Sequence, residues 1–136
     1  MYEAISSMRR ILINDINVSS SVTVGNIRVG FQRQVDSYPC VAFYRIGGSS
    51  VGRFGYKTAV GGSKDRTEDV MLQVDLFHLG SMEDLELLDD YVIKAVMSGA
   101  RPGESFTLFG NTGGFDFNYD CFRSIQTWTY SRIVSD

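Results

Sequence analysis

EDVMLQVDLFHLGSMEDLELLDDYVIKAVM, residues Glu68 to Met97, decides the fold of this chain, because it joins a strand pattern to a helix pattern across one turn. In its first half, apolar residues recur at every second position, while Gln73 and Asp75 interrupt the other face. The apolar set is Val70, Leu72, Val74 and Leu76. This alternation is typical of a strand packed on one side, as in an antiparallel sheet.

The second half has the pattern of a capped amphipathic helix. Gly80 ends the strand, and Ser81 can cap the helix with Asp84 at the capping-box position. Apolar residues then recur at helical spacing, so the helix should pack back on the strand. We expect the contact to be formed by Leu72, Val74, Leu85, Leu88 and Val92.

Acidic residues crowd the other face of this helix: Glu83, Asp84, Glu86, Asp89 and Asp90. Acids early in a helix suit its macrodipole, so a solvated face explains them. A face turned toward a partner explains them equally well.

The composition is that of one globular domain spanning residues 1–136. The chain is 43% hydrophobic, enough to bury a core without metals or disulfides. We expect Cys40 and Cys121 to be small packing residues, with a reactive thiol as the alternative. The formal charge of -3 argues against a dedicated nucleic-acid binder. With neither a leader pattern nor a long apolar stretch, the sequence favours a soluble, unexported protein.

The remaining elements complete an α+β fold: an antiparallel sheet of about four strands flanked by two helices, with a long β-hairpin-like loop. Trp128, the only tryptophan, is expected to anchor the core or a subunit contact. The pattern predicts a first helix over 2–14, a loop over 18–25, strands over 27–31, 40–46 and 105–109, a turn over 111–114 and a closing strand over 121–133.

The Gly-rich stretch from Gly47 to Arg66 is cationic and aromatic, and has three competing interpretations. A phosphate cradle would need a GxxxxGK[ST] or GxGxxG pattern, which does not occur. A single-strand nucleic-acid grip would stack bases on aromatics and pair cations with phosphates. We favour an arm that becomes ordered against another subunit, since its apolar surface is small. The residues concerned are Arg53, Phe54, Tyr56, Lys57, Lys64 and Arg66.

Catalytic patterns are nearly absent. His78 has no sequence-visible catalytic or metal partner, so we expect a dispensable histidine at a strand end. Asp116 and Asp120 have the spacing of a carboxylate pair, but nothing supplies the burial that would raise one pKa. No nucleophile elbow occurs. We therefore expect no enzyme, no cofactor and no metal.

In their order, these motifs resemble the tail terminator, or tail completion, proteins of long-tailed bacteriophages and related viruses. The resemblance covers nearly the whole chain. Its matching parts are the N-terminal helix, RVG at Arg28 to Gly30, YPCVAFYRIGG from Tyr38, the strand and helix from Asp69 to Met97, and CFRSIQTWTYSR from Cys121.

The resemblance implies a homo-oligomer, a hexameric ring at the head-proximal end of the tail tube. The ring would stop polymerisation of the tail tube protein and join the tail to the neck or head-completion protein. DNA would pass through its channel without being read, and no membrane would be involved. The implied location is the virion, after assembly in the host cytoplasm.

The charge distribution is compatible with a ring, which joins two different patches of each subunit. Cations from Arg45 to Arg66 precede the strand, and acids from Glu68 follow it without a Lys or Arg until Lys94. Opposite charges could set the register between neighbours. The expected interface residues are Arg53, Phe54, Tyr56, Lys57, Lys64, Arg66, Glu83, Glu86, Asp89 and Asp90.

Two other functions compete with this one. A tail tube or neck-connector subunit also makes rings from small sheet domains with long loops. A single-stranded nucleic-acid-binding module would use the basic aromatic loop, and its affinity would depend on salt.

Overall fold

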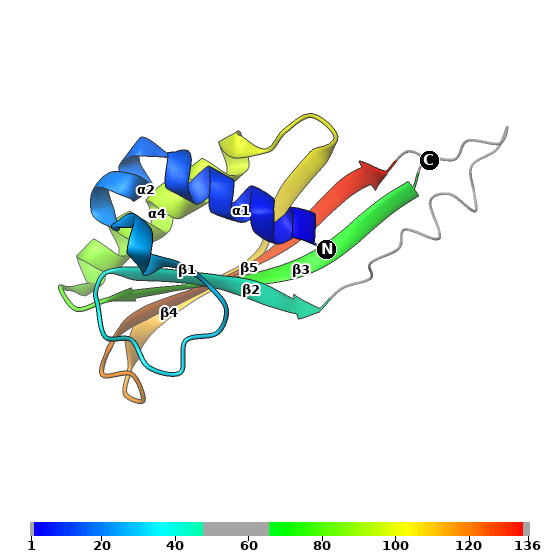
Figure 1. Ribbon diagram of the computed structural model, residues 1–136. Helices are drawn as coiled ribbons and strands as arrows, with labels where there is room; N and C mark the ends of the chain where they lie inside the picture. The colour runs from blue at the N-terminus through cyan, green and yellow to red at the C-terminus, as the bar shows by residue number, and fades with distance from the viewer. Residues whose placement is uncertain (1, 48–65, 135–136) are drawn as a thin grey trace, which may run out of the picture.

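The computed structural model describes residues 2–47 and 66–134, in which helices cover one face of a twisted sheet (Figure 1). The described helices are α1 (Tyr2–Asn14), α2 (Ile16–Ser21) and α4 (Met82–Gly99), with a 3-10 turn at Val24–Asn26. The described strands are β1 (Ile27–Val29), β2 (Cys40–Gly47), β3 (Arg66–His78), β4 (Glu104–Asp116) and β5 (Cys121–Val134). The predicted α+β class is confirmed.

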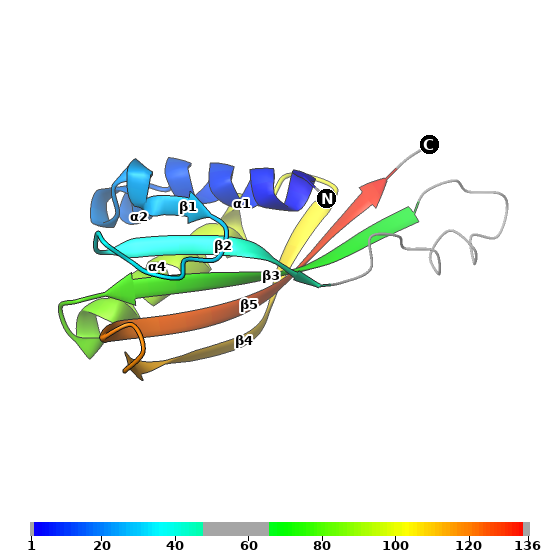
Figure 2. The same cartoon turned by 60° about the horizontal axis from the view of Figure 1, so that its bottom comes forward.

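The five-stranded sheet of the described residues has the order β1-β2-β3-β5-β4, which Figure 2 displays from its open side. It is mixed, because β1 pairs with β2 in parallel while the other pairs are antiparallel. The expectation of a purely antiparallel sheet of about four strands with two helices is corrected here. The parallel pair needs a crossover. It is supplied by residues 30–39, which begin at Gly30 with φ 108° and return the chain to the start of β2.

A short helix, α2, occupies part of the segment predicted to be a loop. The Asp15 side chain caps it by accepting hydrogen bonds from the N–H groups of Asn17 and Val18. Val18 is buried, so one apolar residue and one cap suffice for this turn and a half. The hydroxyl groups of Ser20 and Ser21 donate to carbonyl groups four residues earlier. Because serine side chains often bond to the backbone in turns instead, the serine-rich composition predicted a loop here.

The β4 strand continues through the stretch predicted to turn at Asn111 to Gly114. Its pairing with β5 runs from Glu104 to Asp116 and shifts by a bulge between Leu108 and Gly110. After the bulge the pairing continues through Asn111 to Gly114, so tertiary pairing overrides the local turn preference.

The main core lies between the sheet and the helices. Leu72 and Val74 of β3 and Leu85, Leu88 and Val92 of α4 are all buried in one cluster. The predicted contact between strand and helix is therefore confirmed. Trp128 of β5 is fully buried in the same cluster, which confirms its role as a core anchor.

The opposite, open face of β3 is also partly covered, which the expectation of one-sided packing missed. A second buried cluster consists of Cys40, Ala42, Phe77 and Cys121. Tyr38 and Tyr119, from the two loops that cross this face, pack against it. Within the described ranges, no helix combines the length and apolar character needed to cross a membrane.

We predict that Leu88→Ala lowers the free energy of unfolding by about 2–5 kcal/mol, because it empties a buried site that rigid neighbours cannot refill. The neighbouring Leu87 is 51% exposed, so Leu87→Ala is the matched control and should change stability little. Urea unfolding of both variants is the measurement. Equal effects of the two substitutions would contradict the assigned helix face.

Candidate functional site

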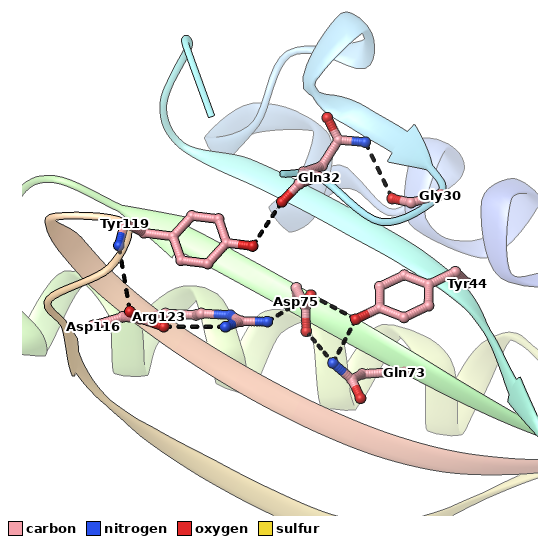
Figure 3. Close-up of polar contacts among 8 residues, drawn as sticks. All are labelled: Gly30, Gln32, Tyr44, Gln73, Asp75, Asp116, Tyr119 and Arg123. Atoms are coloured by element: carbon pink, nitrogen blue, oxygen red, sulfur yellow. Dashed lines mark hydrogen bonds and ion pairs between the residues drawn. The ribbon is translucent and has the colours of Figure 1, made fainter. Parts of the chain in front are cut away.

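Arg123 of β5 is the centre of a polar network on the open face of the sheet (Figure 3). Its Nη2 lies 3.0 Å from Oδ2 of Asp75 on β3, and its Nη1 lies 3.0 Å from Oδ2 of Asp116 at the end of β4. The Asp75 side chain is fully buried. One guanidinium group therefore fastens three adjacent strands together, with the fork geometry that suits arginine for paired carboxylates.

Asp75 has further partners on β2 and β3. The Tyr44 hydroxyl donates to Asp75 Oδ2 at 3.0 Å, and Gln73 Nε2 donates to Asp75 Oδ1 at 2.8 Å. Gln73 Nε2 also donates to the Tyr44 hydroxyl oxygen at 2.6 Å. Both oxygens of the buried carboxylate are thus engaged, as burial of a charge requires.

The same network holds down two loops. Asp116 Oδ1 accepts hydrogen bonds from the N–H groups of Asn118 and Tyr119 in the β4–β5 hairpin. The Tyr119 ring lies 4.8 Å from the Arg123 guanidinium carbon, and its hydroxyl donates to the Gln32 carbonyl at 2.7 Å. The hairpin and the 30–39 crossover are therefore tied to each other across β3.

The electrostatics favour fixed charges in this network. Burial opposes ionisation of Asp116, but hydrogen bonds from Arg123 and from the turn N–H groups outweigh it, so the pKa of Asp116 is lowered. Burial, and next the Asp75 charge, raise the pKa of Tyr44. A general acid would need a carboxyl group with a raised pKa. Among the described carboxyl groups with a resolved shift, Asp36, Glu104 and Asp116, every pKa is lowered.

A second network joins α1 to the sheet through Glu104. The hydroxyl groups of Ser7 and Tyr130 donate to Glu104 Oε2 at 2.8 and 2.7 Å. Arg10 Nη2 and the Arg101 N–H donate to Glu104 Oε1 at 3.2 and 2.9 Å. Burial opposes ionisation of Glu104, but these donors outweigh it and lower its pKa. Like Asp116, Glu104 is a structural anion.

The acidic face of α4 divides into two parts. Glu83, Glu86 and Asp90 are exposed, as an interface would require, and Asp90 pairs with Lys94 at 2.9 Å. Asp89 instead turns toward the sheet. Its Oδ1 accepts from Ser124 Oγ at 2.6 Å and from Gln126 Nε2 at 2.7 Å.

Asn111 Nδ2 completes the contact by donating to Asp89 Oδ2 at 2.7 Å. The expectation that Asp89 belongs to the outward acidic surface is therefore corrected. Sheet side chains offer its carboxylate three hydrogen bonds and so draw it inward.

The basic part of the predicted interface falls mostly on undescribed segments. Arg53, Phe54, Tyr56, Lys57 and Lys64 lie outside the described residues. Arg66 is the first residue of β3, where it is paired in register with Val134.

The remaining candidate residues have ordinary environments. His78 Nδ1 accepts a hydrogen bond from the Gly80 N–H at 2.9 Å, which satisfies this strand-end histidine locally. Asp116 binds Arg123, and Asp120 lies in the hairpin turn with φ 55°. In the described part of the chain, no three or more His, Cys, Asp or Glu side chains cluster closely enough to hold a metal ion.

The cysteines are packed as predicted. Cys40 and Cys121 are free and buried, and burial is the main cause that raises the pKa of both thiols. A raised pKa lowers the fraction of reactive thiolate, so neither has the environment of a nucleophile.

Sequence reasoning missed the residues at the centres of both networks, Arg123 and Glu104, and the burial of Asp75. Polar residues at alternate positions of a strand are usually solvated, so their pattern indicated exposure. One signal was present in the sequence. Strand alternation places Asp75 between Gln73 and Phe77 on one face, and a large aromatic residue there indicates that other residues cover this face. Phe77 is indeed fully buried.

We predict that Arg123→Met destabilises the fold by about 3–5 kcal/mol, because it leaves the Asp75 carboxylate buried without its cation. Lys94→Met breaks an exposed pair on α4 and serves as the control, with an expected cost below about 1 kcal/mol. Denaturant unfolding measures both. The double variant Asp75→Asn with Arg123→Met should recover part of the loss. A cost for Arg123→Met no larger than for the control would contradict the structural role of the pair.

Stability should also fall in acid. The pKa values of Glu104 and Asp116 are lowered in the folded chain from ordinary values of 4.5 and 3.8. Their contribution is therefore complete above pH 4.5 and is lost as the pH falls through the lower folded values. The free energy of unfolding, measured in urea between about pH 6 and about pH 3, should show this loss. Glu104→Gln should flatten the profile, and an unchanged acid slope in that variant would contradict the assignment.

Comparison with known proteins does not identify a function for this chain. Scans against protein-family models and curated proteins found no match to the chain. What the chain does must therefore be inferred from its sequence motifs, its two polar networks and the surfaces that these networks leave exposed.

Proposed function

We propose that this chain is a structural virion protein whose subunits form a ring on the head-proximal end of a viral tail tube, where the ring ends tube polymerisation and joins the tail to the neck. The resemblance of the ordered motifs to tail terminator proteins supports it. The charged groups of both described networks hold strands and loops together, which suits a structural protein.

The exposed acidic face of α4 is the observation that carries the proposal. Glu83, Glu86 and Asp90 point outward, and Lys94 pairs with only one of them. Such a face is complementary to the cationic sequence from Arg53 to Arg66. A contact between the two on neighbouring subunits would be heterologous, which is the kind of interface that closes rings.

The finer parts of the proposal follow from the resemblance. The ring is a hexamer, its neighbours are the tail tube protein and the neck or head-completion protein, and DNA passes through the channel without sequence-specific contacts. The chain acts without catalysis or a cofactor, and its location is the tail of the virion after assembly in the host cytoplasm.

The proposal predicts that the chain forms single rings and that these rings limit the length of tail tubes. Native mass measurement and electron micrographs should show monomers or one ring size, whereas a tube or connector subunit should stack into longer assemblies. Added to polymerising tail tube protein of the same virus, the chain should lower the mean tube length. Tight, salt-dependent binding to single-stranded DNA with no effect on tubes would favour the nucleic-acid-binding alternative.

Charge reversal tests the acidic face directly. Replacing Glu83, Glu86 and Asp90 by Lys should abolish the ring, because like charges then meet across the contact. Adding Arg53→Glu and Lys57→Glu should restore it. Glu3→Lys, at an exposed position of α1, is the control and should leave the ring intact. A ring that survives the triple reversal would remove the electrostatic contact from the proposal.

A further inference from the structure

Among the strands that the structure describes, β4 forms a long free edge of the sheet. It lies last in the strand order and spans 13 residues, Glu104–Asp116. An edge strand presents a row of backbone N–H and C=O groups that no neighbour pairs. Residues Ser105 to Phe115 contain no charge and no proline.

This edge has little of the protection that isolated proteins usually carry. Edge lysines, prolines, bulges and short strands prevent unwanted pairing with other chains. Of these features, β4 has a bulge between Leu108 and Gly110. Phe109 sits at that bulge and is 75% exposed. Towards the hairpin, Phe117 is 87% exposed and packs edge-on against Phe115. A neutral edge with exposed aromatic rings is suited to pairing with another strand.

An acidic surface flanks the β4 edge. The α4 helix packs beside β4, where Asp89 binds Asn111. It carries five acidic residues and one lysine, of which Glu83, Glu86 and Asp90 are exposed. A strand that adds to this edge would therefore be favoured if cations accompany it.

The opposite edge of the sheet, β1, has the complementary character. Val29 is 51% exposed, and Phe31, just after the strand, is 59% exposed. Residues 24–35 contain Arg28 and Arg33 but no acid. Arg28 is shared with Asp36, while Arg33 is exposed. The β4 edge is thus neutral, with exposed aromatic rings and an acidic helix beside it, whereas the β1 edge has exposed apolar residues and one exposed arginine, Arg33.

We infer that the β4 edge of one subunit pairs with the β1 edge of a second copy of this chain, so that the sheet continues from subunit to subunit. The pairing is heterologous, because the two edges differ in length, charge and sequence. Only three residues of β1 are available to the ladder. Phe109, Val29 and Phe31 therefore supply much of the buried apolar surface, and the acidic face of α4 meets Arg33, which follows β1.

This inference rests on the proposed ring and adds a strand-to-strand contact to its interface. The test uses lysine substitutions, since lysine is the residue that natural edges use against pairing. Phe109→Lys blocks the β4 edge and Val29→Lys blocks the β1 edge. Ile16→Lys places the same charge at another 75% exposed apolar residue, on α2, and is the matched control.

Native mass of each full-length variant is measured at concentrations where the wild type is assembled. Phe109→Lys and Val29→Lys should each be monomeric, while Ile16→Lys assembles as the wild type does. An equimolar mixture of the two edge variants should form dimers and nothing larger, because one intact β4 edge can meet one intact β1 edge. Circular dichroism checks folding, and Thr107→Lys or Phe31→Lys replaces a variant that does not fold.

Several results would overturn the inference. They are a wild type that is monomeric at every concentration, assembly of both edge variants, and dimers of Val29→Lys alone, which would indicate pairing of β4 with β4. The proposed function is tested separately by tube length. Rings that shorten tubes in spite of both lysines would refute this interface alone. Assembly through these edges without any effect on tubes would refute the proposed function alone.

Discussion

The burial of β3 on both faces is the constraint on which the rest of the structure depends. On one face, Leu72 and Val74 pack against α4 in the main core. On the other, Phe77 and Asp75 are fully buried beneath the crossover and the hairpin. An apolar core alone would satisfy the first face. The second face contains a carboxylate, whose burial is tolerable only because Arg123, Tyr44 and Gln73 supply its hydrogen bonds.

This buried charge links local loop structure to the whole sheet. Arg123 reaches Asp116, and Asp116 holds the hairpin turn by accepting two backbone N–H groups. Glu104 acts in a corresponding way at the other end of β4, where it joins α1 to β5. The long edge strand is therefore clamped near both ends by structural anions, while its middle, with Phe109, remains exposed. A rigid edge loses less conformational entropy when another strand adds to it.

The sequence predicts the parts of the fold in which local pattern and tertiary packing agree. Strand alternation and helical spacing from Val70 to Val96 locate β3, α4 and their contact. The same apolar residues produce the periodic pattern in the sequence and the packing between strand and helix. The sequence fails where tertiary pairing opposes local preference. Asn111 to Gly114 has turn chemistry, yet it stays extended because β5 pairs with it across the bulge. A short strand over 27–31 is predicted, but its parallel pairing with β2 is not, since the direction of a three-residue strand depends on a crossover that leaves no periodic pattern in the sequence.

The candidate site is predictable to a smaller extent, for a related reason. Charge pattern separates acids on α4 from cations earlier in the chain, but it cannot tell an outward carboxylate from one that turns inward. Asp89 and Asp90 are neighbours, yet Asp89 binds the sheet and Asp90 binds Lys94. Their difference arises from the 100° step of the helix, which turns one toward Ser124 and the other toward solvent. The two edges of the sheet also differ in sequence, so a contact between β4 of one subunit and β1 of another would be heterologous.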